Sequence, residues 1–384
     1  MDPVIYFVTN ICPHYRLPLF RLLGRLHRVR FLFFSEPAEE RGWEGRNPSS
    51  AEGLPGGYLP GLRCCGLRWV PSLYRALLGD RYDILIKCIN GKMPLLLSYL
   101  IARTRRIPFI LWTGLWHNPG GLLHRAGFPV VRHIYRHADA VVVYGSHTRG
   151  YLAELGVKEE NIFEAWQAVD NGHFGRRVPP EAVPGLRKRL GIGARKVILY
   201  VGRLEKEKGL EYLGEALREF PDTEGAALVA AGEGRFRKEW EEGLARIPHL
   251  AVRFPGYVEY DLLPEYYAMA WVLVLPSVTT PSFREPWGLV VNEAFNQGCP
   301  VVATRAVGAA RGGLLREGET GLVVPERDAH ALGLALRTIL GDARLRATLG
   351  GNARREIREW TFERMEEGFE KAIRSVRGGR GEEV

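Results

Sequence analysis

The sequence predicts an α/β protein built from two doubly wound domains, and three observations support this fold class. Short apolar, β-branched runs alternate with amphipathic segments of helical length through most of the chain, which is typical of parallel sheets. A polar, Gly- and Pro-rich stretch at 170–184 separates two halves of similar size. The length of 384 residues suits two domains at about 100–200 residues each.

The first half contains five expected strands and at least two expected helices. The helices cover Leu17–Leu26 and Pro94–Ala102. The strands cover Val4–Val8, Val29–Phe34, Ile84–Cys88, Phe109–Trp112 and Ala140–Tyr144. We therefore expect residues 1–175 to form an N-terminal, Rossmann-like domain.

The second half repeats the alternation and ends in a helical segment. Its expected strands cover Val197–Val201, Ala227–Ala231, Val252–Phe254, Val272–Pro276, Pro300–Ala303 and Gly321–Val324. Arg354–Val376 has an apolar stripe with helical period. We expect a C-terminal, Rossmann-like domain at 176–355 and a final helix at 356–384. In such a pair of domains the ligand site lies at strand carboxyl ends, in the crevice between the domains.

Composition and charge restrict the class of protein. An apolar fraction of 46% with 25% charged residues is ordinary for a globular protein and excludes extended disorder. Residues 1–175 carry +7 of the net charge of +9. A basic surface of this kind can face nucleic acid, anionic lipid or a phosphorylated substrate, and the sign of the charge does not choose among them.

Targeting signals and cysteines point to the cytoplasm. The five cysteines are few and scattered, so we expect reduced thiols rather than a disulfide framework. Val4–Val8 follows the N-terminus without the basic and long apolar regions of a secretory signal. No run approaches 18 uninterrupted apolar residues, and we expect no membrane-spanning segment.

The strongest functional signal lies between Pro276 and Thr304. An expected strand ends at Pro276, a loop holds Glu285, and Gly288 opens an expected helix that carries Glu293. Helix starts bind anions through their free N–H groups. Eight residues span at most about 12 Å in a helix, roughly the length of a nucleotide diphosphate sugar from ribose to sugar. The alternative is that both carboxylates are simply solvated.

A second block follows the expected strand Val197–Val201. Its loop, Gly202–Gly209, carries Arg203 and Lys208. Two cations at one strand end suit a diphosphate and would stabilise it as a leaving group. The alternative is a solvated loop in which Glu205 and Glu207 pair with these cations.

Together, these two blocks resemble the retaining GT-B glycosyltransferases of family 4. The family pattern of an E-x7-E pair and a GRL-x-x-x-KG loop is matched by Glu285 and Glu293 and by Gly202–Gly209. The resemblance covers roughly Lys196–Pro325 and is weak across the first half. It implies a GT-B architecture, in which two Rossmann-like domains face each other across a cleft and the final helix returns to the first domain.

The resemblance also implies a role for each matched residue. Glu285 would bind hydroxyls of the donor sugar and Glu293 the ribose, while Arg203 and Lys208 would bind the diphosphate. Further donor contacts would come from the backbone N–H groups of Gly288, Leu289 and Val290, from Gly202, and from Tyr257 and Val258 beside the base.

The first half departs from the family pattern. Where relatives often have a glycine pair after the first strand, this chain has Thr9 to Pro13, followed by His14 and Arg16. We expect these two side chains to bind the acceptor, and a structural ion pair is the alternative for Arg16. His117 is the candidate for the histidine that lines the reaction site in relatives, and a surface histidine is the alternative.

Two further sequence patterns bear on contacts with a metal ion and with a membrane. His133 and His137 have i, i+4 spacing that can bind zinc, but neither an HExxH pattern nor a Cys partner accompanies them, and no Asp-x-Asp motif occurs. We expect no metal and no cofactor. Leu22, Leu23 and Leu26 with neighbouring arginines either rest on anionic lipid or pack on their own sheet.

The sequence therefore predicts a retaining, metal-independent glycosyltransferase of the hexosyltransferase type. It would move a sugar from a nucleotide diphosphate sugar to a hydroxyl of a glycan, lipid-linked or phosphorylated acceptor, in polysaccharide or glycolipid assembly. We expect no nucleic-acid partner and a cytoplasmic location with peripheral contact to anionic membrane. The alternatives are a phosphorylase or sugar-nucleotide epimerase of the same fold and a non-enzymatic ligand-binding module.

Overall fold

A computed structural model describes residues 2–35, 51, 53–64, 67–118, 120–219, 225–247 and 250–378. The chain forms two compact units. Unit 1 comprises Met1–Gly114, Leu122–Trp166 and Phe362–Val384, and unit 2 comprises Leu115–Gly121 and Gln167–Thr361. Each unit contains one parallel sheet, which confirms the predicted fold class.

The sheet of unit 1 has the strand order β3-β2-β1-β6-β7-β8-β9, and its paired strands are all parallel. Leu62–Cys64 (β4) and Leu67–Trp69 (β5) form a separate antiparallel pair. The bounds of the sheet strands are Val4–Thr9 (β1), Arg28–Phe33 (β2), Gly56–Tyr58 (β3), Ile84–Cys88 (β6), Phe109–Thr113 (β7), Ala140–Val143 (β8) and Ile162–Glu164 (β9).

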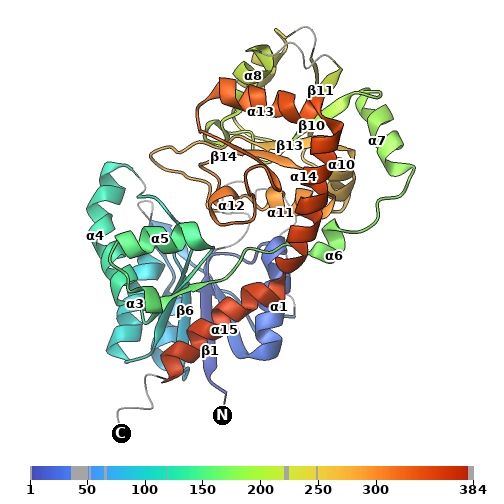
Figure 1. Cartoon of the computed structure of the whole chain (residues 1–384). Helices are drawn as coiled ribbons and strands as arrows, with labels where there is room; N and C mark the ends of the chain where they lie inside the picture. Colours follow the sequence, from blue (N-terminus) through green and yellow to red (C-terminus); the bar gives the residue numbers. More distant parts are fainter. Residues whose placement is uncertain are drawn as a thin grey trace. The chain divides into compact units, whose positions relative to one another are not determined.

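Helices cover both faces of this sheet, because successive side chains of a strand point to opposite sides. Phe7 of β1 contacts Phe20 of α1 and Phe369 of α15 on one face. On the other face, Tyr6 belongs to the cluster that contains Leu73 of α2. Figure 1 shows α15 beside α1. The helices of unit 1 are Leu17–Leu26 (α1), Pro71–Gly79 (α2), Lys92–Thr104 (α3), Leu122–His137 (α4), Ser146–Glu154 (α5) and Phe362–Gly378 (α15).

The sheet of unit 2 has the strand order β12-β11-β10-β13-β14-β15, again parallel throughout. Its strands are Lys196–Val201 (β10), Ala226–Ala231 (β11), Ala251–Gly256 (β12), Val272–Leu275 (β13), Val301–Thr304 (β14) and Gly321–Val324 (β15). Its helices are Asn171–Phe174 (α6), Ala182–Leu190 (α7), Leu210–Glu219 (α8), Arg237–Leu244 (α9), Leu263–Met269 (α10), Val290–Asn296 (α11), Gly308–Arg311 (α12), Ala329–Gly341 (α13) and Ala343–Glu356 (α14).

The expected helix Arg354–Val376 is divided in the structure. It comprises the end of α14, a short 3-10 turn at Ile357–Glu359, and α15. Trp360 leaves the helical conformation with φ −96° and ψ 74°. The break coincides with the change of unit after Thr361. The apolar residues of this one segment are therefore divided between the core of unit 2 and the core of unit 1.

Short 3-10 turns complete the described secondary structure. Besides Ile357–Glu359, they comprise His14–Arg16 (η1), Glu159–Asn161 (η3), Lys206–Lys208 (η4) and Tyr260–Leu262 (η6). η1 and η4 each follow the first strand of their unit, β1 and β10, so the predicted acceptor and diphosphate residues both lie at strand carboxyl ends.

Candidate active site

The strand order of unit 2 marks where a ligand should bind. From β10 the chain runs outward through β11 and β12 on one side, and then through β13, β14 and β15 on the other. In a doubly wound sheet, ligands bind outside the carboxyl ends of the strands at this reversal. The loops after β10 and β13 meet there, and they are the loops that carry the two predicted motifs.

These two loops lie in direct backbone contact. Gly209 has φ +69°, and a Cβ atom at this position would lie 1.9 Å from the carbonyl oxygen of Pro276. The backbone N–H of Val278 donates to the carbonyl of Glu207 at 3.0 Å. Only glycine permits both the positive φ and this approach. Gly209, which ends the Gly202–Gly209 loop, is therefore needed to bring this loop against the loop that carries Glu285.

Lys208 and Glu285 form an ion pair at this contact. The Lys208 ammonium donates to Oε2 of Glu285, and the two side chains are only 12% and 10% exposed. The fully buried Ser277 donates to the same oxygen at 3.0 Å. The other carboxylate oxygen, Oε1, accepts no hydrogen bond from the described residues. The backbone of Glu285 is fixed as well, because its carbonyl accepts from Gly308 at 3.1 Å.

Arg203 lies at the start of the Gly202–Gly209 loop, and its side chain is more exposed than that of Lys208. Its side chain is 42% exposed and its guanidinium lies 3.3 Å from Glu207. The hydroxyl of buried Tyr200 donates to the Arg203 carbonyl at 2.6 Å, which fixes the backbone while the side chain stays accessible. The alternative of pairing within the loop thus applies to Arg203, whereas Lys208 pairs with Glu285 instead of a neighbour in its own loop.

Glu293 lies on α11 beside Tyr267 of α10. The hydroxyl of Tyr267 donates to Oε2 of Glu293 at 2.5 Å. Burial raises the pKa of Glu293 to about 7, although the bond from Tyr267 opposes this shift. Burial, followed by the neighbouring Glu293 carboxylate, raises the pKa of Tyr267 well above its usual value. A half-protonated carboxyl at neutral pH can donate to or accept from a hydroxyl.

The remaining predicted donor contacts lie in the same unit. Gly288 has φ +90°, and a Cβ there would lie 2.7 Å from the Leu275 side chain, so the turn before α11 is tight. In the described residues, the N–H groups of Gly288, Leu289 and Val290 have no acceptor. Gly202 donates to the carbonyl of Ala231. Tyr257 is 42% exposed and Val258 is buried.

The segment Leu115–Gly121 belongs to unit 2, although its sequence neighbours belong to unit 1. Trp116 donates from Nε1 to the carbonyl of Glu285 at 2.9 Å, and the Arg284 guanidinium lies 3.5 Å from its ring centroid. Both ring nitrogens of His117 are buried without a hydrogen-bond partner in the part of the chain that the structure describes. Burial, followed by Arg284, lowers the pKa of His117, which favours the neutral ring. A ligand hydroxyl would satisfy these nitrogens.

The two predicted acceptor residues lie in unit 1, just after β1. Arg16 is 6% exposed and its guanidinium lies 5.2–5.5 Å from the ring centroids of Tyr15, Trp112 and Tyr144. Its Nη1 also contacts Met365 of α15 at 3.6 Å. His14 is half-buried, and burial lowers its pKa. Aromatic rings therefore surround Arg16, and its role toward an acceptor stays a prediction.

In the part of the chain that the structure describes, no third ligand joins His133 and His137. His137 donates from Nδ1 to the carbonyl of His133, and the two rings stack at 4.0 Å. Within the described ranges, one other group has three side chains close enough to share an ion, namely His27, Glu366 and Glu370. His27 already lies 2.8 Å from Glu366. A hydrogen bond between His27, which directly follows α1, and Glu366 of α15 accounts for this contact.

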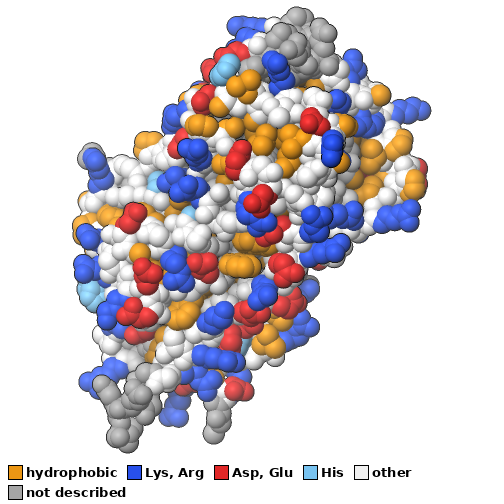
Figure 2. All heavy atoms as spheres, viewed as in Figure 1, with side chains coloured by type: hydrophobic (Ala, Val, Ile, Leu, Met, Phe, Trp, Pro, Cys, Tyr) orange, Lys and Arg blue, Asp and Glu red, His pale blue; other side chains and the backbone are white. Residues whose placement is uncertain are grey.

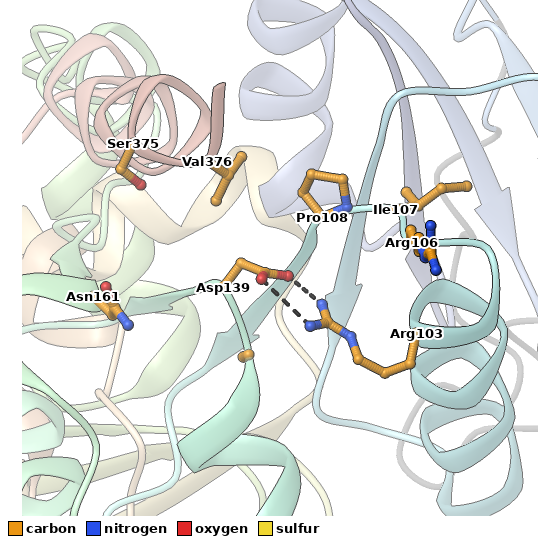
Figure 3. Close-up of a pocket in the computed structure, with 9 residues that line it drawn as sticks. Arg103, Arg106, Ile107, Pro108, Asp139, Asn161, Ser375 and Val376 are labelled. Carbon is orange, nitrogen blue, oxygen red and sulfur yellow. Dashed lines mark hydrogen bonds and ion pairs between the residues drawn. The ribbon is translucent and has the colours of Figure 1, made fainter. Parts of the chain in front are cut away.

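A cavity of about 550 Å³ in unit 1 does not coincide with either set of predicted residues. It is lined by the ion pair of Arg103 and Asp139, with Pro108 and Val376 nearby (Figure 3). Pro108 precedes β7 and Asp139 precedes β8, so the cavity lies at the amino ends of these strands. Ligands of doubly wound sheets bind at the opposite edge.

Sequence reasoning missed three residues that position the site. Ser277 and Tyr267 donate to Glu285 and Glu293, and Trp116 fixes the Glu285 carbonyl. Ser277 directly follows the strand end at Pro276, which could have identified it. Nothing in the local pattern around Trp116 indicates a partner 169 residues away.

Comparison with known proteins gives the family. Residues 184–356 match the family described as glycosyl transferases group 1, and residues 13–163 match the glycosyl transferase 4-like domain. A GDP-mannose-dependent alpha-(1-6)-phosphatidylinositol monomannoside mannosyltransferase of Mycolicibacterium smegmatis is 30% identical over 290 residues, which cover 73% of each chain. The chain belongs to the group 1 glycosyltransferases.

Other relatives of this group 1 glycosyltransferase agree with the family and the fold. The sulfoquinovosyl transferase SQD2 of Arabidopsis thaliana is 30% identical over 242 residues, which are 61% of this chain but only 44% of the plant protein. The crystal structure of Anabaena Alr3699/HepE in complex with UDP matches with a TM-score of 0.76 at 20% identity, covering 97% of this chain and all of the other. The fold is therefore GT-B.

Proposed function

We propose that this group 1 glycosyltransferase moves a sugar from a nucleotide diphosphate sugar to an acceptor hydroxyl with retained configuration and without a metal. The observation that carries the proposal is the ion pair of Lys208 and Glu285 at the reversal point of the unit 2 sheet, with Arg203 at the neighbouring strand end. The related proteins named above are transferases, which favours transfer over phosphorolysis or epimerisation.

The charges suit the two ends of the breaking bond. Sugar transfer passes through an oxocarbenium-like state, so negative charge grows on the departing phosphate. Lys208 has three N–H donors, and Glu285 occupies only one of its directions. Arg203 adds a planar fork suited to phosphate oxygens. We propose that these two cations stabilise the leaving diphosphate and take the place of a metal ion.

The carboxylate of Glu285 is suited to bind the sugar of the donor. Oε2 of Glu285 is held by Lys208 and Ser277, which leaves Oε1 available to accept from a ligand. We propose that Oε1 accepts from donor-sugar hydroxyls while neutral His117 binds another hydroxyl of the same ring. Glu293 would bind the ribose. The family resemblance further implies front-face attack, in which the leaving phosphate takes the acceptor proton.

A donor screen tests this proposal. Purified protein is incubated with UDP, GDP, ADP and TDP sugars, and release of the nucleotide is measured together with the anomer first formed, by proton NMR. We expect one nucleotide class to be hydrolysed slowly with retention, unchanged by EDTA. Glu285→Gln should reduce the rate by about 100-fold or more. Glu317→Gln, a surface carboxylate of the same unit, is the matched control. Inversion, EDTA sensitivity or full activity of Glu285→Gln would refute it.

We also propose peripheral contact with anionic membrane at the inner face, where a lipid-linked acceptor would lie. No helix among the described residues combines the length and apolar character needed to cross a bilayer. In α1, Leu23 is buried and the helix packs against α15, which favours the packing alternative for that helix. On the face shown in Figure 2, basic side chains are spread out among acidic ones.

The helix α4 is the better candidate for this contact. Arg125, Arg132 and Arg136 are exposed on it, together with Val130 at 46%. Such a mixture of cations and apolar side chains suits anionic lipid. Flotation with vesicles of phosphatidylcholine and 30% phosphatidylglycerol should recover the wild type, and Val130→Asp should weaken recovery. Leu334→Asp, a change at a similarly exposed apolar residue of α13, should not. Equal recovery of both variants would exclude α4.

A further inference from the structure

A completely buried lysine lies at the carboxyl end of β6 in unit 1. Lys87 is 0% exposed, and its ammonium donates to the carbonyls of Cys88 at 2.5 Å and Asn90 at 2.8 Å. It also reaches Oδ1 of Asn90 at 3.3 Å and lies 4.8 Å from the centroid of the Phe34 ring. No carboxylate pairs with it in the described residues. Burial accordingly lowers the pKa of Lys87 to about 7.

A lysine in this position is costly, because burying a charge without a countercharge loses its hydration. All of the oxygens that hold it belong to its own strand end and to the loop that follows. The ammonium therefore fixes the conformation of Ile89 to Gly91. Gly91 has φ +75°, and a Cβ there would lie 2.8 Å from the Phe34 ring, so this loop has little room to shift.

Asn90 extends the network to the neighbouring strand. Its Nδ2 donates to Oδ1 of Asn10 at 2.5 Å and to the hydroxyl of Thr9 at 3.3 Å. The carbonyl of Asn10 in turn accepts from the backbone N–H of Ser35 at 2.8 Å. Hydrogen bonds thus link the ends of β6, β1 and β2. In the described residues, Nδ2 of Asn10 donates to no acceptor.

The place of this network in the sheet is specific. From β1 the chain runs outward to β2 and β3 on one side and then to β6 through β9 on the other, so β1 and β6 flank the reversal point of unit 1. Ligands bind at the carboxyl ends of strands at such a point. This is also the position at which Thr9 and Asn10 stand in place of a glycine pair.

We propose that Asn10 and Asn90 bind neighbouring hydroxyls of a carbohydrate acceptor and that Lys87 is the positioning residue for both. This inference rests on the proposed transferase function. Asn10 keeps the N–H donors of its Nδ2, and Oδ1 of Asn90 keeps one acceptor position beside Lys87, so the pair offers a donor and an acceptor to two adjacent sugar hydroxyls. The lysine itself is sealed from solvent, so the network presents neutral polar atoms and does not present a charge suited to phosphate.

The test separates transfer from hydrolysis. With the donor identified by the screen, n-octyl glycosides of glucose, galactose and mannose serve as acceptors, and the ratio of octyl disaccharide to free sugar is measured. We expect Asn10→Ala, Asn90→Ala and Lys87→Met each to lower this ratio at least 10-fold. Hydrolysis should stay within threefold and the nucleotide Kd within twofold of wild type. Asn161→Ala, at the amino end of β9 in the same unit, is the matched control.

A conservative variant guards against a merely structural effect. Lys87→Gln keeps N–H donors for the two carbonyls and should recover the ratio to within about threefold of wild type. Thermal unfolding identifies any variant that fails to fold. If Lys87→Met does not fold, the two asparagine variants still decide the assignment.

Several outcomes would overturn the proposal. One is a wild type that hydrolyses the donor but neither transfers to an octyl glycoside nor binds one in saturation-transfer NMR. Another is an unchanged ratio in both asparagine variants, and a third is equal loss of hydrolysis and transfer. Failure of the transferase function itself would differ, because the wild type would then hydrolyse no nucleotide sugar while octyl-glycoside binding would still report on Asn10 and Asn90.

Discussion

Two lysines at the reversal points of the two sheets are held in opposite ways. Lys208 of unit 2 pairs with a carboxylate and keeps 12% of its side chain exposed. Lys87 of unit 1 is completely buried and is held by neutral oxygens alone. The difference fits the two roles proposed above. Lys208, proposed to act on a phosphate, needs access and a countercharge in the absence of ligand, whereas Lys87, proposed to shape loops, can be sealed from solvent.

We expect the largest effect when the charge of Lys208 is removed. Lys208→Ala should lower donor hydrolysis by about 100- to 1000-fold, because a donor to the leaving group is lost and Glu285 is left without its cation. Lys206→Ala is the matched control, since Lys206 is 64% exposed and pairs with Glu239. Initial rates of nucleotide release decide the matter. Equal loss in both variants would mean that Lys208 is no more than a loop charge.

Arg203→Ala tests the second, more exposed cation of the same loop. Arg203 is 42% exposed and its partner Glu207 is in the same loop, so its loss should disturb the fold little. We expect donor turnover to fall about 10- to 100-fold and nucleotide diphosphate binding to weaken by calorimetry. Normal affinity for UDP and GDP in this variant would remove Arg203 from the site.

Ser277→Ala tests the support of the Lys208 and Glu285 pair. Ser277 donates to Glu285 at 3.0 Å and is completely buried, so the variant leaves one carboxylate bond unmade. We expect turnover to fall about threefold to tenfold, corresponding to roughly 1 kcal/mol for one hydrogen bond. Ser282→Ala, in the same loop but exposed, should be neutral. A larger loss in Ser282→Ala than in Ser277→Ala would contradict the assignment.

Glu293, like Lys87, is a buried ionisable group without an oppositely charged partner among the described residues. Glu293→Gln tests this through the pH dependence of the free energy of unfolding. Burial raises the pKa of Glu293 from 4.5 to about 7, so the folded state binds this proton more tightly than the unfolded state does. The stability of the wild type should therefore fall as pH rises from about 4.5 to 7 and then level off. Without nucleotide at pH 8, the variant should be more stable by on the order of 1–2 kcal/mol in urea unfolding. A less stable variant at pH 8 would contradict the shifted pKa.

The sequence predicted all six strands of the unit 2 sheet and five of the seven strands of the unit 1 sheet, and it missed the three-residue strands β3 and β9. Expected strands such as Ile84–Cys88 and Gly321–Val324 have the bounds found in the structure, because buried parallel strands are short, continuous apolar runs. The positions of the two proposed donor motifs were also predictable, since each directly follows such a strand. Local patterns failed where tertiary contacts decide, as in the assignment of Leu115–Gly121 to unit 2.

The acceptor side shows the same limit more clearly. Lys87 stands within an apolar strand and gives no sign of being buried, and Asn10 and Asn90 are 80 residues apart in sequence. Only the pairing of β1 with β6 brings them together. Arg16 was expected at an acceptor, but its three aromatic neighbours come from separate segments that no sequence pattern connects.

A crystal structure with the nucleotide selected by the donor screen tests the central claim most directly. The account predicts the diphosphate within hydrogen-bond distance of Arg203 and Lys208, at the carboxyl ends of β10 and β13, with the ribose beside Glu293. A diphosphate bound elsewhere, for example among the arginines at the amino ends of β7 and β8 in unit 1, would contradict it.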